Sequence, residues 1–204
     1  MVRLIDLAFQ KLELILNEMS EEALKSLDML AYFKKHHTAK ELKEISDKLR
    51  KLKEEAGELI LEILVRYQPM ATDLRFAKSA MEISYDLYRI SRYSYDIALA
   101  LDEANLSLDE CIDADVQNNI EKVKSMLNLT IKAMLERNKD LAIEIKNMDQ
   151  VIDKAYKEYF YKALVYKGGK CSIANLLIMR YLERIADHCA YIADEILFVI
   201  KGSK

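Results

Sequence analysis

The stretch YLERIADH, residues 181–188, decides how the whole chain is interpreted, because it combines a helical pattern with a pair of acids. It lies inside an apolar-periodic run over residues 172–200. Glu183 and Asp187 are four residues apart and therefore share one side of a helix. An earlier stretch, DLYRISRY at residues 86–93, has the same frame but lacks both acids. Together they predict a duplicated helical unit that keeps its acidic site in the second copy only.

The composition predicts an all-α protein. Only one proline and four glycines occur among the 204 residues, whereas average usage is about 5% for proline and about 7% for glycine. Apolar residues make up 51% of the chain, so it can bury a sizeable core. This length fits one large domain or two domains of roughly 100 residues each.

The periodicity predicts six helices, three in each half of the chain. Their apolar residues recur at alternating three- and four-residue steps, the pattern of tightly packed antiparallel bundles. Pro69 ends the second helix, Thr72 or Asp73 caps the third, and the glycines at 168–169 end the fifth. The predicted helices cover residues 2–33, 38–67, 72–101, 108–137, 140–166 and 172–200. We therefore expect two tandem three-helix bundles related by internal duplication, with residues 1–104 as the first and residues 105–204 as the second.

The charge pattern excludes several classes of partner. The net charge is −3, and basic and acidic residues are interspersed without the Lys/Arg-rich patch expected for nucleic acid or an anionic membrane. No apolar run approaches the roughly 18 residues of a membrane span. The first six residues include two charged ones where a secretory signal would be apolar. We expect a cytoplasmic protein with no nucleic-acid partner and no direct membrane insertion.

The cysteine pattern predicts free thiols. Cys111, Cys171 and Cys189 are odd in number and lack C-x-x-C spacing. Thiols in a reducing compartment are therefore favoured over disulfides or a zinc site. Cys189 lies on the apolar seam of the last helix, where we expect a buried thiol.

Two pairs of acids form a candidate metal site. Asp149 and Asp153 directly follow seam residues of the fifth helix, and Glu183 and Asp187 flank the seam of the last helix in the same way. Because one residue is about 100° around a helix, the four carboxylates could converge in one surface cluster. Several anionic oxygens suit a hard cation, and their mutual repulsion favours its binding. The alternative, that these acids are merely solvated, stays open.

The first half of the chain lacks these acids. The corresponding positions hold Ser46, Arg50, Tyr88 and Arg92. Two of the four are cations, which would repel a metal ion. We therefore expect the first copy to bind no metal at this place.

Three motifs carry a family resemblance. The string LERIADHCAYIA at residues 182–193 is similar to the L-E-R-I-G-D-x-x-x-N-I-A string that ends each repeat of the PhoU family of phosphate-transport regulatory proteins. The string QPMATDLR at residues 68–75 is similar to the family's Q-P-x-A-x-D-L-R, and Asp149 and Asp153 match its D-x-x-x-D. The chain thus resembles the PhoU family along essentially its full length.

The resemblance implies a non-enzymatic role for two three-helix bundles. PhoU proteins are cytoplasmic negative regulators of phosphate uptake that contact the phosphate ABC transporter and, in bacteria, the sensor kinase of the phosphate-starvation response. Some members bind multinuclear iron or zinc clusters, and the resemblance extends this role to Asp149, Asp153, Glu183 and Asp187. Arg92, like Tyr88 beside it on the helix, departs from the acids of the first family motif, so a symmetric pair of clusters is not implied.

Two other functions are weighed against this one. A di-metal carboxylate enzyme built on a helical bundle needs Glu-x-x-His motifs that project into the core, and the sequence contains none. A helical-bundle adaptor without a metal or phosphate role would differ from the regulator only in its partners and metal content.

Four tyrosines crowd the predicted third helix: Tyr85, Tyr88, Tyr93 and Tyr95. Most are expected to pack inside the bundle. A subset could form a protein-binding face, and on this basis we expect a homodimer.

Overall fold

The computed structural model describes residues 3–31, 38–106, 111–165 and 169–201, and these parts contain six α-helices and no strand. The helices are α1 (Leu4–Ala31), α2 (Thr38–Tyr67), α3 (Ala71–Glu103), α5 (Ala114–Glu136), α6 (Lys139–Val165) and α7 (Lys170–Lys201). Each of the six matches a helix that the periodicity predicts, with differences of a few residues at the ends. The all-α prediction is confirmed.

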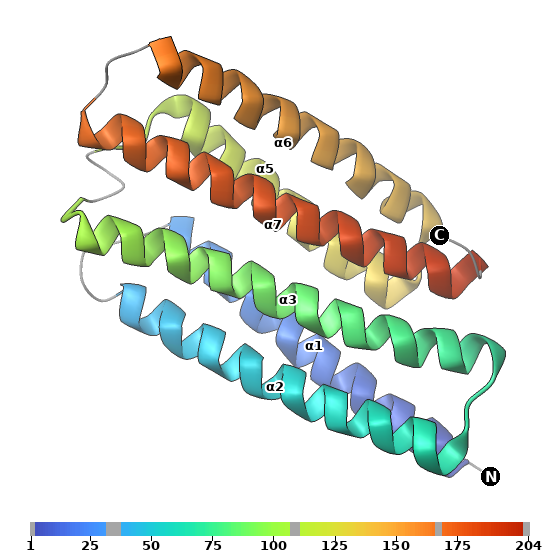
Figure 1. The fold of residues 1–204 in the computed structure, drawn as a ribbon. Helices are drawn as coiled ribbons and strands as arrows, with labels where there is room; N and C mark the ends of the chain where they lie inside the picture. Colours follow the sequence, from blue (N-terminus) through green and yellow to red (C-terminus); the bar gives the residue numbers. More distant parts are fainter. Residues whose placement is uncertain (1–2, 32–37, 107–110, 166–168, 202–204) are drawn as a thin grey trace.

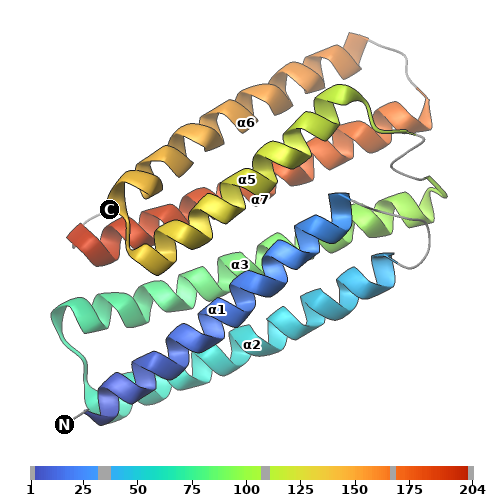
Figure 2. The ribbon, with the colours of Figure 1, turned by 180° about the vertical axis from the view of Figure 1, so that it is seen from behind.

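The helices form two layers of three (Figures 1 and 2). Helices α1, α2 and α3 pack on one another, α5, α6 and α7 do the same, and the α3–α7 contact is the main junction between the two bundles. Helices α2 and α6 lie at the two outer edges (Figure 1). The expected pair of three-helix bundles is confirmed, whereas the exact boundary at residues 104 and 105 stays a prediction.

The predicted seams are the core of the protein. Seam residues such as Leu42, Leu49, Ile120 and Leu182 are fully or almost fully buried. The buried apolar side chains of both bundles belong to one continuous cluster. The hydrophobic effect therefore holds the two bundles together as well as stabilising each of them.

Helices α3 and α7 cross the junction in antiparallel directions (Figure 1). Asp86 contacts His188, and Tyr93 stacks near Tyr181 with ring centroids 5.6 Å apart. In the duplicated frame, residues 86 and 93 correspond to residues 181 and 188. The internal duplication therefore relates these two contacts to each other. One is the polar pair of Asp86 and His188, and the other is the aromatic pair of Tyr93 and Tyr181.

The start of α3 differs from the prediction. The N-cap is Met70, which has extended backbone and makes no side-chain capping hydrogen bond, instead of Thr72 or Asp73. Gln68 and Ala71 on either side of Pro69 have positive φ angles of 45° and 50°. Because the chain turns at these residues, the helix begins at Ala71, before the polar residues Thr72 and Asp73 that the capping pattern indicates.

The start of α5 is also corrected. The helix begins at Ala114, whereas the periodicity predicts a start near Leu108, which lies outside the described residues. Asp113 is the N-cap, and its Oδ1 accepts a hydrogen bond of 2.9 Å from the backbone N–H of Val116. An aspartate in this position satisfies an N–H group that the first turn leaves without a partner.

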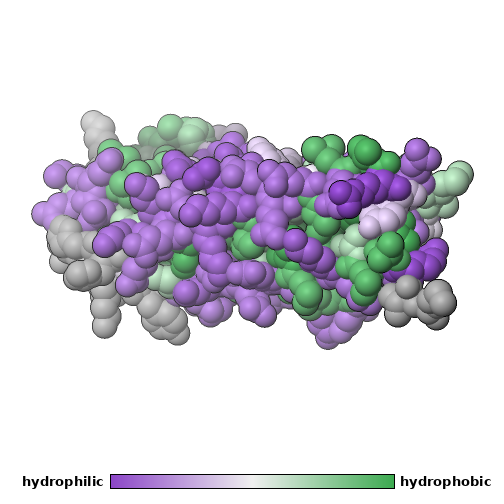
Figure 3. All heavy atoms as spheres, turned by 90° about the horizontal axis from the view of Figure 1, so that it is seen from below, coloured by the Kyte–Doolittle hydropathy of each residue, from purple (hydrophilic) through white to green (hydrophobic). Residues whose placement is uncertain are grey.

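Exposed apolar side chains gather at the end of the first bundle where α1 begins and α2 ends (Figure 3). They include Leu4, Leu61, Val65 and Met70, each more than half exposed. The longest apolar stretches of the described helices still contain too many charged residues, or are too short, to cross a bilayer.

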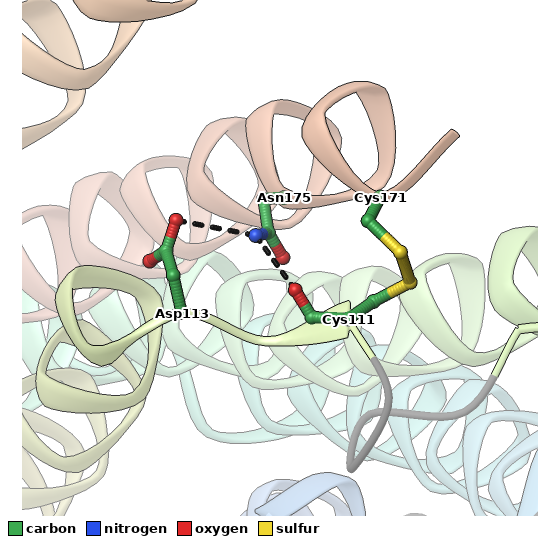
Figure 4. The surroundings of a disulfide bond; sticks show 4 residues. All are labelled: Cys111, Asp113, Cys171 and Asn175. Carbon is green, nitrogen blue, oxygen red and sulfur yellow. Dashed lines mark hydrogen bonds between the residues drawn. A yellow bond between two sulfur atoms is a disulfide. The ribbon is translucent and has the colours of Figure 1, made fainter. Parts of the chain in front are cut away.

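The prediction of three free thiols is wrong for two cysteines. Cys111 and Cys171 form a disulfide, with Cα atoms 4.9 Å apart, that ties the segment before α5 to the first turn of α7 (Figure 4). The amide nitrogen of Asn175 donates hydrogen bonds to the Cys111 carbonyl and to Asp113 beside this bond (Figure 4). The pair is 60 residues apart in sequence, so spacing carries no sign of it. Cys189 is a buried thiol as expected, and burial raises its pKa to about 12.

Candidate metal centre

Three of the four predicted carboxylates come together between α6 and α7. One oxygen each of Asp149, Asp153 and Asp187 lies within 4.8 Å of the other two, and all three side chains are half-buried. Asp149 and Asp153 are one turn apart on α6, and Asp187 lies on the neighbouring face of α7. The helical spacing and the α6–α7 contact thus bring the three oxygens to one place.

Glu183 lies beside this trio but is held by a basic partner. Its two oxygens each lie 2.7 Å from Nη1 of Arg180 and accept hydrogen bonds from it. Asp187 accepts a hydrogen bond of 2.6 Å from Nη1 of Arg184. The two α7 acids therefore each have a guanidinium counter-ion, and a metal ion would compete with these arginines for their oxygens.

The surroundings of Asp149 disfavour its charged form. Burial, followed by the negative charges of Asp153 and Asp187, raises its pKa to about 6. Its Oδ1 is buried and has no hydrogen-bond partner among the described residues. A cation placed between the three carboxylates would relieve both the repulsion and the lost solvation.

The charge of the site also acts on Glu183. Burial and the neighbouring charge of Asp187 raise the pKa of its carboxyl group, although Arg180 opposes the shift. Glu183 is thus close enough to add an oxygen ligand after release from Arg180, without belonging to the preformed trio.

The donor set is made of carboxylate oxygens. The imidazole of His188, although next to Asp187 in sequence, is buried in the junction between the bundles, where its Nδ1 lies 2.7 Å from Oδ1 of Asp86. Oxygen-only sets suit hard cations, whereas zinc sites of proteins more often include nitrogen or sulfur ligands. The residues present therefore fit a hard cation better than zinc.

The corresponding place in the first bundle carries positive charge. Arg92 forms a salt bridge of 2.9 Å with Asp96, Arg50 pairs with Glu54 at 3.3 Å, and Lys53 lies over the ring of Tyr88. A metal ion needs at least three acidic, histidine or cysteine side chains close enough to share it. Among the described residues, no such cluster lies in the first bundle. Whether the first bundle binds a metal ion stays a prediction.

A polar network in the junction was not predicted from the sequence. The hydroxyl of Tyr93 accepts hydrogen bonds from Arg89 at 2.6 Å and from Arg184 at 3.4 Å. Burial alone would raise the pKa of Tyr93, but the two arginines outweigh it and lower the pKa. Because Arg184 also holds Asp187, this network connects the first bundle to the acidic trio. Arg89 and Arg184 occupy matching positions of the two copies, and that match is the sequence signal that could have found them.

A buried carboxylate lies further along the same junction. Glu195 of α7 is 3% exposed and accepts hydrogen bonds from Lys78 at 2.9 Å and from Ser79 at 2.8 Å, both on α3. Its sequence position resembles any solvated acid of a helix, so only the packing of α3 against α7 shows that it is buried.

Comparison with known proteins gives a consistent result over most of the chain. The family model described as "PhoU domain" matches residues 16–101 and 106–196, once in each bundle. A phosphate-specific transport system accessory protein PhoU homolog of Clostridium acetobutylicum is 30% identical over 75% of this chain and 73% of its own length. A PhoU homolog 1 of Methanothermobacter thermautotrophicus is 28% identical over 93% of this chain and 90% of its own.

Solved structures share the fold. The crystal structure of PhoU from Pseudomonas aeruginosa has a TM-score of 0.85 at 22% identity and covers 97% of this chain and 99% of its own. The phosphate transport system regulatory protein PhoU from Streptococcus pneumoniae has a TM-score of 0.72, also at 22% identity, with 98% of both chains covered. The two matches to the family model together span most of the chain, and the chain therefore belongs to the PhoU family.

Proposed function

We propose that this protein is a regulatory accessory protein of a phosphate-transport system and acts in the cytoplasm as a negative regulator of phosphate uptake. The observation that carries the proposal is the match of both bundles to the PhoU domain. Relatives that match most of the chain are named as accessory proteins of the phosphate-specific transport system. Its partners would be a subunit of the phosphate ABC transporter, a phosphate-responsive sensor kinase, or both, and it would have no catalytic role.

The second bundle would supply a metal centre to this regulator. Asp149, Asp153 and Asp187 would hold the ion, and Glu183 would join them after release from Arg180. A bound cation would neutralise the charge that raises the pKa of Asp149 and would tie α6 to α7. A set of carboxylate oxygens suits a hard cation such as Mn²⁺, and an iron or zinc cluster is the occupant that the family resemblance implies.

Elemental analysis tests the metal centre. The parent protein and an Asp149→Ala/Asp187→Ala variant are purified without chelator, and iron, zinc, manganese and nickel are measured. We expect metal in the parent and a loss of most of it in the variant. The matched control is Glu58→Gln/Glu62→Gln, an acid pair at the same four-residue spacing on α2 of the first bundle, which should keep the parent content. Metal-free parent protein, or equal loss in the control, would contradict the assignment.

Co-purification tests the regulatory role. The protein is captured from phosphate-replete cells that carry its own phosphate transporter, and the recovered partners are identified. We expect the transporter's ATPase subunit or a phosphate-responsive kinase. Recovery of other partners only, from metal-free protein, would instead support the helical-bundle adaptor.

The homodimer remains part of this proposal. Among the four tyrosines of α3, Tyr85 is 45% exposed, whereas Tyr93 is buried. Tyr88 and Tyr95 are partly buried, so Tyr85 is the most exposed of the four and the one we expect to contact a second copy. Sedimentation equilibrium of the parent and of Tyr85→Ala tests this contact, and a monomeric parent at all concentrations would exclude the dimer.

A further inference from the structure

The outer face of α6 near its end combines exposed apolar side chains with lysines. Tyr161, Leu164 and Val165 are between 66% and 87% exposed. At about 100° per residue, these three side chains and those of Lys154 and Lys157 fall within an arc of about 100° on the helix. α6 contacts α5 and α7 and makes no comparable contact with the first bundle, so this arc faces outward.

The start of α7 lies at the same end of the second bundle as the end of α6 (Figure 1). Ile173 is 71% exposed, and Lys170 is an exposed residue in the first turn. We call the surface formed by Lys154, Lys157, Tyr161, Leu164, Val165, Lys170 and Ile173 the α6 tip. Exposure this high means that the apolar side chains protrude from the surface instead of lining a groove. A protruding apolar group surrounded by lysines is typical of proteins that insert side chains into the boundary of a lipid bilayer.

The related end of the first bundle lacks the positive charge. The last twelve residues of α2, 56–67, contain two glutamates and one arginine, whereas the last twelve of α6, 154–165, contain three lysines and one glutamate. The α2 end nevertheless exposes Leu61 and Val65 to a similar extent. The duplication therefore provides two apolar ends of opposite net charge, and only the α6 tip complements an anionic surface.

The sequence predicted no patch for an anionic membrane, because its basic and acidic residues alternate. Folding changes this locally. Lys154 is 3.9 Å from Glu158 and Lys162 is 2.9 Å from Asp115, so each of these two lysines has an acidic partner. Lys157 and Lys170 make no salt bridge within the described parts of the chain and supply the unpaired positive charge. At the same 100° per residue, Asp149 and Asp153 lie about 120° and about 80° from Tyr161 around α6. Asp153 is about 20° from Leu164 around the helix, but about three turns away from it along the axis.

We propose that the α6 tip docks on the anionic surface of a lipid bilayer, with Tyr161, Leu164, Val165 and Ile173 entering the headgroup boundary and the lysines contacting lipid phosphates. Such docking is peripheral and requires no membrane-spanning helix. It would place the protein at the membrane independently of any protein partner.

Vesicle co-sedimentation of the full-length protein tests the proposal. Vesicles of phosphatidylcholine alone are compared with vesicles of equal parts phosphatidylcholine and phosphatidylglycerol. We expect binding to the second kind only, weakened by added salt. Tyr161→Ser/Leu164→Ser/Val165→Ser should lower the partition constant at least tenfold. Lys154→Gln/Lys157→Gln should also lower it at least tenfold, because each lysine near an anionic surface contributes about a fivefold factor.

The matched control is Leu61→Ser/Val65→Ser on α2, which removes apolar groups of similar exposure from the end without net positive charge. This variant should bind like the parent. Absence of binding by the parent would overturn the proposal, and so would equal binding to both kinds of vesicle or equal loss in the control. If the α6 triple variant instead loses concentration-dependent self-association, the surface serves a second copy of the chain and the lipid proposal is wrong. Because every α6 substitution is at an exposed site, circular dichroism should show unchanged helicity, and metal content should stay at the parent value.

Discussion

The two bundles share one helical frame but differ in what their polar positions do. In the second bundle Asp149, Asp153 and Asp187 face one another, and the buried oxygen of Asp149 has no partner among the described residues. In the first bundle Arg50 and Arg92 occupy the related positions, and each is paired with an acid on its own helix. The apolar seams are alike because both bundles must bury the same stripes. The polar positions do not have to be buried, so they can differ between the copies. One copy keeps acids that repel one another, and the other has arginines in their place.

The junction shows the same divergence at a single repeated contact. Asp86 and His188 form a buried polar pair, whereas the related positions hold Tyr93 and Tyr181. An internal two-fold relation thus does not require chemical symmetry. It requires only that each pair fill its space and satisfy its polar atoms.

The largest expected effect concerns the disulfide, which the first bundle does not share. Cys111→Ser/Cys171→Ser should lower the free energy of unfolding by up to about 4 kcal/mol, because the bond closes a loop of 60 residues in the unfolded chain. Urea unfolding measures the loss. Reduction of the parent by a dithiol should give the same loss and have no effect on the double variant. Unchanged stability after complete reduction would show that the bond adds nothing to the second bundle.

The second effect compares the two related contacts of the junction. His188→Ala should lower the free energy of unfolding by about 3 kcal/mol, because it leaves the buried carboxylate of Asp86 without its partner. Tyr181→Phe at the related contact should cost less than about 0.5 kcal/mol, since the aromatic stacking is kept. Thermal unfolding of both variants measures the difference. Equal costs would mean that the polar and aromatic pairs contribute alike.

A third prediction concerns the pH dependence of the second bundle without metal. The pKa of Asp149 is raised to about 6 in the folded state, so the folded protein binds a proton that the unfolded chain has already lost. Stability should therefore fall as pH rises from about 4 to about 6. Asp149→Asn should remove this dependence and stabilise the protein at pH 7 by about 1 kcal/mol, a value that allows for solvent screening.

Chelator-treated protein, unfolded by urea at several pH values, provides the measurement for Asp149→Asn. Asp96→Asn in the first bundle is the control, because Asp96 is paired with Arg92. The control should not gain stability at pH 7. A gain as large as that of Asp149→Asn would show that the effect is not specific to the acidic trio.

The smallest effect concerns a helix start. Asp113 caps α5 with its side chain, but Met70 gives α3 no such bond. Met70→Ser should stabilise the protein by about 0.5 to 1 kcal/mol, because a serine hydroxyl can accept a hydrogen bond from the first turn. Removal of the existing cap by Asp113→Ala should cost at least as much. A destabilised Met70→Ser variant would indicate that the exposed methionine contributes by packing instead.

Particular residues show how far sequence reasoning reaches. The acids of α6 and α7 were assigned correctly to one region, because four-residue spacing and a seam position are local properties of a helix. The membership of Glu183 was not decided, because its side chain can turn either to the trio or to Arg180. The α3 cap was misplaced, because the capping pattern does not register the left-handed turn at Gln68 and Ala71.

The sequence by itself determined the six helices, their pairing into two bundles, the duplication and the asymmetry of the acidic site. Each of these features follows from the spacing of apolar and charged residues along a single helix. That spacing is a local pattern, because residues three or four apart share one face of the helix. Only the tertiary structure decided the Cys111–Cys171 bond, the burial of Asp86, His188 and Glu195, and the gathering of lysines at the α6 tip. These depend on the register between helices that are far apart in the chain, and many different side-chain pairings are compatible with the same apolar seam.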